Sequence, residues 1–155
     1  MRKRTVLAMV VFAGLAVGAG QGRAQEDRGA WNAASSSAET VTGAVTIYKD
    51  RVAIDLLLYP LAEIRRLKPV EVSAVFDADV NAGIEGTLYR LNVAPGQRFQ
   101  HKNTLCGDEA AQWMATYVTG KRMQVAFFSG DDIPVFTFDA ISKSTNVCGT
   151  FVYSR

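Results

Sequence analysis

The sequence predicts a mainly β domain, a small antiparallel barrel or sandwich with one short helix and one disulfide. Three observations lead to this prediction. Apolar side chains recur at every second position in several short segments, which is the period of a half-buried strand. Turn signals rich in glycine, proline and aspartate separate these segments. The chain has two cysteines, Cys106 and Cys148, and each is followed by glycine.

The first 24 residues have the pattern of a cleavable secretory signal peptide. Basic residues at 2–4 precede an apolar stretch over 6–19, and Ala24 fits cleavage before Gln25, with an earlier cleavage before Gly20 as the alternative. The apolar stretch is shorter than the roughly 20 residues that a membrane-spanning helix needs. We therefore expect a periplasmic or secreted protein without a stable membrane anchor.

Removal of this segment changes the charge of the chain. The full sequence carries a formal charge of +2, whereas the part from residue 25 onward has 13 basic and 15 acidic side chains and a charge of −2. Its charges alternate in sign, so neither nucleic acid nor an anionic lipid surface is an expected partner. The 131 residues that remain suit one domain. We expect an N-terminal arm or strand lead-in over 25–38 and a single β domain over 39–155.

The first half of this domain begins with a predicted hairpin. Alternating runs over 41–47 and 52–58 are separated by Lys49-Asp50. A short helix is expected between Pro60 and Lys68 and should end before Pro69, because the residue before a proline avoids the helical region.

A second hairpin is predicted in the C-terminal half. Residues 108–118 could start a helix, but their alternation favours a strand, because Thr119-Gly120-Lys121 then forms a turn into a strand over 123–127. The remaining strands are expected over 70–77, 84–91, 135–138 and 147–153.

Cys106 and Cys148 are expected to form a structural disulfide. The chain has no C-x-x-C spacing and no histidine cluster that would suggest zinc, and an exported protein enters an oxidising compartment. Closing the loop of 42 residue steps should stabilise the domain by about 4 kcal/mol. Two buried free thiols are the alternative.

No motif for catalysis or metal binding meets its chemical requirements. His101 is the only histidine and lies among basic residues, with no acid nearby in the sequence. The acids over 77–85 resemble a calcium loop, but alanine replaces the glycine of the sharp turn and leucine the final acid. Asp131 and Asp132 follow a glycine, where aspartate commonly serves the turn. We therefore expect no catalytic, cofactor or metal site.

Aromatic residues crowd the C-terminal third. Phe127 and Phe128 are neighbours on one predicted strand and must face opposite sides of it. One can fill a core, and the other needs a second sheet, a loop, a ligand or a partner protein as its cover. The candidate binding surface consists of Trp31, Phe128, Asp131 and Asp132.

Three segments carry a resemblance to a known group of proteins. Residues 103–107 (NTLCG), 125–130 (VAFFSG) and 147–155 (VCGTFVYSR) resemble small exported proteins of Gram-negative bacteria that have no assigned function. The resemblance covers roughly the C-terminal third and implies a fold more than an activity. Residues 29–31 (Gly-Ala-Trp) are similar to the G-x-W entry of lipocalin-like and periplasmic protease-inhibitor barrels.

These observations favour a non-catalytic binding protein over two other classes. A disulfide-braced β scaffold with exposed loops suits a protein that binds or inhibits another protein, such as a hydrolase that enters the periplasm. A carrier of a small apolar ligand is the first alternative, supported by the doubled aromatic faces. A hydrolase of cell-wall or glycan substrates is the second, and it lacks an evident acid/base pair.

Overall fold

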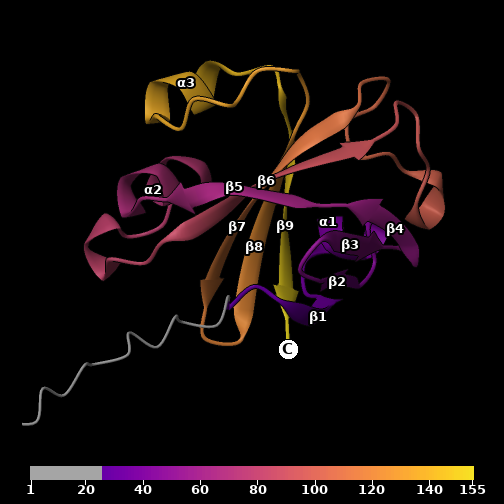
Figure 1. Cartoon of the computed structure of the whole chain (residues 1–155), viewed down its shortest axis with the longest axis horizontal. Helices are drawn as coiled ribbons and strands as arrows, with labels where there is room; N and C mark the ends of the chain where they lie inside the picture. The colour runs from indigo at the N-terminus through magenta and orange to yellow at the C-terminus, as the bar shows by residue number, and fades with distance from the viewer. Residues whose placement is uncertain (1–25) are drawn as a thin grey trace, which may run out of the picture.

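The computed structural model describes residues 26–155, so the expected signal peptide and its cleavage site lie outside the described residues. The described residues form nine antiparallel strands in a single sheet, ordered β4-β3-β2-β1-β9-β8-β7-β6-β5 (Figure 1). The mainly β antiparallel class is confirmed, and the sheet is not closed into a barrel. No helix in this part of the chain is long and apolar enough to cross a membrane.

Most strands are short. They are β1 (Gly29–Ala33), β2 (Val45–Ile47), β3 (Arg51–Ile54), β4 (Leu57–Pro60), β5 (Ala62–Leu67), β6 (Gly86–Val93), β7 (Ala111–Thr119), β8 (Arg122–Phe128) and β9 (Val147–Ser154). Three α-helices, α1 (Ser36–Val41), α2 (Pro69–Phe76) and α3 (Phe138–Lys143), and two short 3-10 helices, η1 (Val80–Ala82) and η2 (Gln100–Lys102), complete the described fold.

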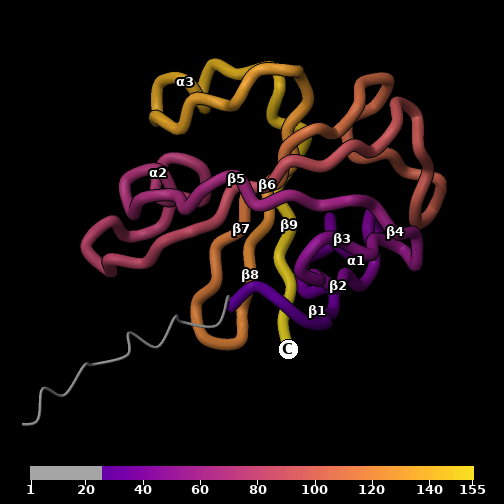
Figure 2. The backbone as a smooth tube through the Cα atoms, viewed as in Figure 1, coloured from indigo at the N-terminus to yellow at the C-terminus, as the bar shows by residue number. Residues whose placement is uncertain are grey.

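The two edge strands of the sheet, β4 and β5, are consecutive in the chain, so the sheet must curl to bring its edges together. Only Leu61 separates β4 from β5, and its backbone N–H donates to the Asp50 carbonyl at 2.9 Å. Figure 2 shows this continuous segment crossing over the long strands. The inner face of the curled sheet therefore encloses one core, to which β1–β3 and β6–β9 all contribute.

A second core lies on the outer face of β6–β8. Met114 and Phe127 face the inner core, whereas their neighbours Trp113 and Phe128 face the outer one, as the two-residue period of a strand requires. The outer core is covered by α2 and by the segment that contains Phe136. Both faces of these central strands are thus buried by the chain itself.

The predicted helix over 60–68 and the predicted strand over 70–77 are both wrong. Residues 62–67 form β5, which pairs with β6, and residues 69–76 form α2. Pro69 begins this helix, because its fixed φ suits the first helical position and its missing N–H would have no partner there. The Glu71 carboxylate accepts the Lys68 N–H at 2.8 Å and caps the same end.

Two further elements differ from the prediction. The expected arm contains β1, which pairs with β2 on one side and β9 on the other. No strand forms over 135–138, because Phe136 turns inward in a loop and Thr137 caps α3 by accepting the Ala140 N–H. The strands expected over 84–91 and 147–153 and the hairpin around Thr119-Gly120-Lys121 are confirmed.

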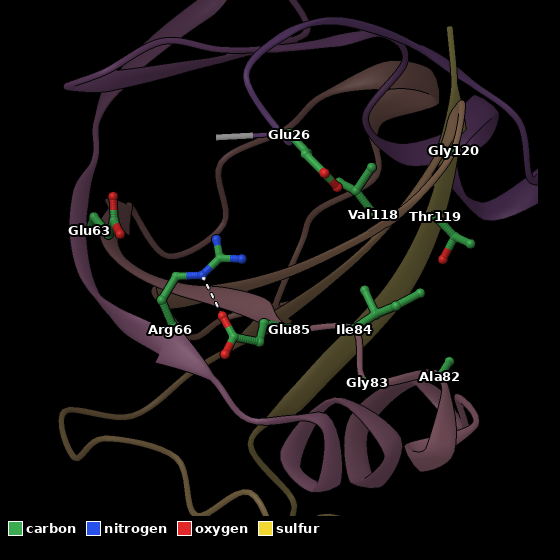
Figure 3. A pocket seen from close by; sticks show the side chains of 10 residues that line it. All are labelled: Glu26, Glu63, Arg66, Ala82, Gly83, Ile84, Glu85, Val118, Thr119 and Gly120. Atoms are coloured by element: carbon green, nitrogen blue, oxygen red, sulfur yellow. Dashed lines mark hydrogen bonds and ion pairs between the residues drawn. The ribbon is translucent and has the colours of Figure 1, made fainter. Parts of the chain in front are cut away.

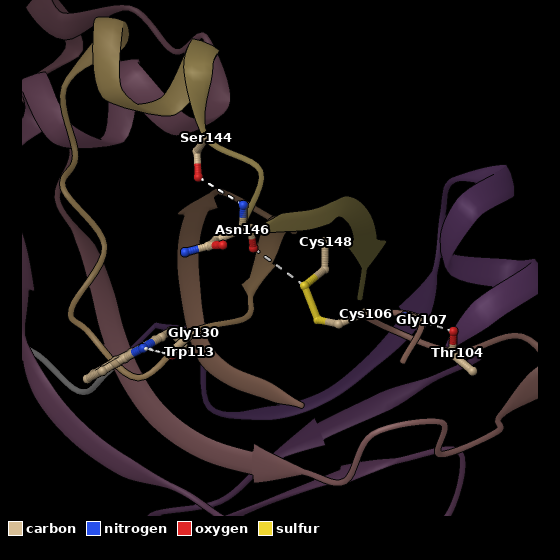
Figure 4. Close-up of a disulfide and its surroundings, with 8 residues drawn as sticks. All are labelled: Thr104, Cys106, Gly107, Trp113, Gly130, Ser144, Asn146 and Cys148. Atoms are coloured by element: carbon tan, nitrogen blue, oxygen red, sulfur yellow. Dashed lines mark hydrogen bonds between the residues drawn. A yellow bond between two sulfur atoms is a disulfide. The ribbon is translucent and has the colours of Figure 1, made fainter. Parts of the chain in front are cut away.

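The Cys106–Cys148 disulfide is confirmed (Figure 4). Cys106 lies in the loop before β7 and Cys148 lies in β9, with Cα atoms 4.8 Å apart. The bond ties the long β6–β7 connection to a central strand of the sheet. It therefore holds together parts of the chain that are far apart in sequence.

Candidate functional site

Trp31 does not belong to a binding surface, which corrects the prediction. Only 1% of the residue is exposed, and it packs in the inner core because β1 lies in the middle of the sheet. Its indole N–H donates to the Asp27 carbonyl at 2.8 Å. The Arg155 guanidinium lies 4.2 Å from the ring centroid and donates to the Arg28 and Glu26 carbonyls, so the last residue holds the segment before β1.

Phe128 is also buried, which is the second correction. It packs edge-on against Phe136, with ring centroids 5.8 Å apart, so its cover is a loop of the same chain. Asp131 and Asp132 are exposed. The Asp131 carboxylate accepts the Gln112 amide at 2.7 Å, and its carbonyl accepts Arg90. The structure therefore does not bring the four predicted residues together in one surface.

The other residues considered for chemistry lie in turns. His101 is exposed in η2 and has a left-handed backbone with φ of 52°. The Asp79 carboxylate accepts the Asn81 N–H at 2.9 Å and caps η1. Within residues 26–155, no group of three or more histidine, cysteine, aspartate or glutamate side chains is placed to hold a metal ion.

The packing of the inner core is relevant to the alternative that the protein carries a small apolar ligand. Side chains from β2, β3, β7, β8 and β9 meet there, and the space between them is too small for a water molecule. An apolar ligand would require these side chains to rearrange. Close packing of this kind is usual for a protein interior.

A cluster of exposed apolar residues lies instead at the β3–β4 hairpin. We call Leu56, Leu57 and Leu58 the leucine tip. Leu56 is 95% exposed, Leu58 is 59% exposed, and Leu57 is 43% exposed. Isolated apolar residues on a surface need no explanation, but adjacent ones suggest a contact site.

The turn at the leucine tip has an unusual residue for its backbone. Ile54 pairs with Leu57, so Asp55 and Leu56 form a two-residue turn, and their φ angles are 48° and 68°. A turn with two positive φ angles favours Asn-Gly or Asp-Gly. Asp55 fits, and its carboxylate accepts the Gln100 amide, whereas a leucine is disfavoured at the second position.

Sequence reasoning missed the leucine tip because the apolar run seemed continuous. Residues 52–58 alternate as if they formed one strand, which would bury Leu56 and Leu58 with Val52 and Ile54. The chain reverses at Asp55 instead, and the two leucines point away from the core. The turn carries neither glycine nor proline, so it lacks the usual sequence signal.

A polar cleft of about 740 Å³ lies at another part of the molecule (Figure 3). Its side chains come from the segment before β1, from β5, from the residues before β6 and from the end of β7. Figure 3 shows Arg66 inside the cleft with its guanidinium directed to Glu85, 3.5 Å away. Glu26 and Glu63 line the same space, so the described residues around this cleft include three carboxylates and one guanidinium.

The leucine tip and the polar cleft are two features of the molecule that suggest a function. Known proteins add no further indication, since no protein-family model, no curated protein and no solved structure matches this chain.

Proposed function

We propose that this chain is a non-catalytic binding protein of the periplasm or the extracellular space, and that its leucine tip enters an apolar pocket on another protein, as an inhibitor would. The observation that carries the proposal is Leu56, an almost fully exposed leucine at a left-handed turn position. The Cys106–Cys148 disulfide is compatible with an oxidising compartment.

The energetics of Leu56 favour a role outside the fold. A left-handed backbone costs an ordinary residue about 1 to 2 kcal/mol. Leu56 recovers none of this cost within the chain, because its side chain contacts solvent. Full burial of a leucine in a partner's pocket would contribute about 1.5 to 3 kcal/mol.

The leucine tip is also held in place before any partner arrives. All four residue pairs of the β3–β4 ladder support it, and the Gln100 amide binds Asp55 at its base. A turn whose backbone is already held in one conformation loses little conformational entropy on binding, which favours affinity. In most interfaces a few fully buried side chains supply most of the binding energy, so Leu56 would need to enter a pocket rather than rest on a flat surface.

The carrier alternative lacks comparable support. The inner core leaves no space for a ligand without rearrangement. Native mass spectrometry of the purified protein separates the two classes, since a carrier would retain a small molecule and a protein-binding module would not.

Site-specific photo-crosslinking tests the proposal. A photoreactive residue at position 56 should capture a distinct protein from the cell-envelope fraction, whereas one at Phe138, a 76% exposed residue on α3, should not. Binding of that protein in purified form should weaken by at least about tenfold in Leu56→Gly and stay unchanged in Phe138→Ser. Equal capture at both positions, or wild-type affinity in Leu56→Gly, would contradict the proposal.

A further inference from the structure

A short segment between β8 and α3 leaves its backbone unpaired. We call residues 132–135 the exposed segment. Within residues 26–155, no backbone N–H or carbonyl of this segment forms a hydrogen bond with another backbone group. Residues 133–136 also contain no helix, strand, turn or bend. Backbone groups without a partner in the fold need water or another molecule as their partner, so the segment is open to binding.

The residues on both sides of the exposed segment are fixed to the fold. Before it, the Trp113 indole N–H donates to the Gly130 carbonyl at 3.0 Å (Figure 4). The Gln112 amide donates to the Asp131 carboxylate at 2.7 Å. After it, Phe136 is 5% exposed and packs in the outer core. The segment is therefore held at both ends by groups of the central strands and of the core beneath them.

The side chains of this region alternate between the surface and the interior. Ile133 is 52% exposed and Val135 is 63% exposed, whereas Pro134 is partly buried and Phe136 is buried. Alternation of this kind is the period of an extended chain. Pro134 favours the same conformation, because its ring fixes its own φ and the residue before a proline avoids the helical region. Two β-branched apolar side chains thus project from an extended backbone.

An extended chain with free backbone groups fits a cleft that binds peptides as an added strand. In such pairing, the N–H and carbonyl groups of alternate residues face the same edge. Ile133 and Val135 would pair with the cleft, and Pro134, which has no N–H, would face the other way and lose no hydrogen bond. The clefts of many proteases bind their substrates in this form.

We propose that the exposed segment binds in the substrate cleft of a serine protease that accepts small apolar side chains, with Val135 in its specificity pocket. The specificity pocket of trypsin takes a basic side chain, that of chymotrypsin a large apolar one and that of elastase a small one. Valine matches the elastase type. Because the backbone is already extended and held at both ends, little conformational entropy is lost on binding.

The fold opposes cleavage of the bond after Val135. Hydrolysis would convert this peptide bond into a carboxylate on Val135 and an amine on Phe136, and the amine would have to leave the cleft. The Phe136 ring packs edge-on against Phe128, with centroids 5.8 Å apart, and the Arg65 guanidinium lies 5.7 Å from its centroid. Both new chain ends would stay close together, so re-formation of the bond competes with release. The segment should therefore inhibit the protease rather than serve as its substrate.

This inference goes beyond the leucine tip and does not depend on it. The exposed segment leads into α3, whereas the leucine tip lies at β4 in another part of the molecule (Figure 1). A protease of this kind would reach an exported protein from outside the cell, whereas the leucine tip is tested against proteins of the cell envelope.

Inhibition of pancreatic elastase tests the proposal. The purified exported protein should inhibit the hydrolysis of a chromogenic peptide competitively, with an inhibition constant in about the micromolar range or below. Trypsin should not be inhibited. Mass spectrometry should find the chain largely intact after incubation with a catalytic amount of elastase. Absence of inhibition, or rapid cleavage after Val135 with loss of inhibition, would overturn the proposal.

Variants locate the contact. Val135→Arg should weaken inhibition of elastase by at least about a hundredfold, because it places a charge in an apolar pocket, and should create inhibition of trypsin. Val80→Arg, at an exposed valine in η1, is the matched control and should change neither. Circular dichroism checks that each variant folds. Should Val135→Arg fail to fold, Ile133→Asp carries the test and should weaken elastase inhibition by at least about tenfold.

Two results of these assays would overturn the assignment. The first is unchanged elastase inhibition in a folded Val135→Arg or Ile133→Asp. The second is a loss of elastase inhibition in Leu56→Gly, which should inhibit as the wild type does. That loss would place the protease at the leucine tip, so it would support the proposed function while contradicting this inference.

Discussion

The β7–β8 and β3–β4 hairpins both close with two-residue turns, but the turns differ in backbone and in residues. In β7–β8, Thr119 pairs with Arg122 across a turn whose first residue is Gly120, with φ of 58°. Glycine adopts this backbone without strain, and the two strands that it joins are buried on both faces. In β3–β4 both turn residues have positive φ and neither is glycine, and the second of them, Leu56, is almost fully exposed. The residues of the β7–β8 turn are therefore explained by the backbone that the turn requires. Leu56 in the β3–β4 turn is not explained in this way, because leucine is disfavoured at this backbone and its side chain makes no packing contact in the fold.

The region around β7–β9 should therefore be the most sensitive to substitution. Replacement of Cys106 and Cys148 by serine, singly or together, removes a loop-closure constraint of about 4 kcal/mol. We expect all three variants to show similar and large losses in thermal midpoint. Thermal unfolding followed by circular dichroism measures this loss. A double variant as stable as the wild type would mean that the disulfide does not brace this region.

A somewhat smaller effect is expected in the outer core. Phe128→Ala leaves a cavity against Phe136 and should lower the free energy of unfolding by about 3 kcal/mol. Phe138→Ala, which removes an exposed ring from α3, should change it by less than about 0.5 kcal/mol. Urea unfolding of both variants measures the difference. Equal losses would show that α3 packs more closely than its exposure indicates.

The sequence predicted the β7–β8 hairpin because its signals are local. Alternation and a Gly-containing turn lie within one short segment, and they agree with the fold around them. Pro69 misled the prediction because proline both ends and begins helices, and only the pairing of β5 with β6 decides between the two. The buried Asp27 carboxylate had no local signal at all. Its hydrogen-bond partners Tyr89 and Thr116 lie 62 and 89 residues away, so its burial depends on the whole sheet.

Glu71, at the start of α2, should make a pH-dependent contribution to the free energy of unfolding. Two hydrogen bonds from Arg65, together with the Lys68 N–H, lower the pKa of Glu71. A lowered carboxyl pKa stabilises the fold above the ordinary glutamate range, and this contribution is lost as the pH falls through the lowered value. Glu71→Gln should therefore cost about 1 kcal/mol near neutral pH and less in acid. Urea unfolding from about pH 7 to pH 3 tests this, and a difference that grows in acid would contradict it.

Substitution of Leu56 is expected to cause no loss of stability, and it tests the account most directly. Leu56→Gly relieves the left-handed strain, and Leu56→Asn replaces leucine by a residue that tolerates this backbone. If Leu56 is retained for a contact outside the fold, both variants should unfold at the same urea concentration as the wild type or at a higher one, with a gain of up to about 1 kcal/mol. A loss of about 1 kcal/mol or more in both variants would contradict the account, because Leu56 would then stabilise the fold itself.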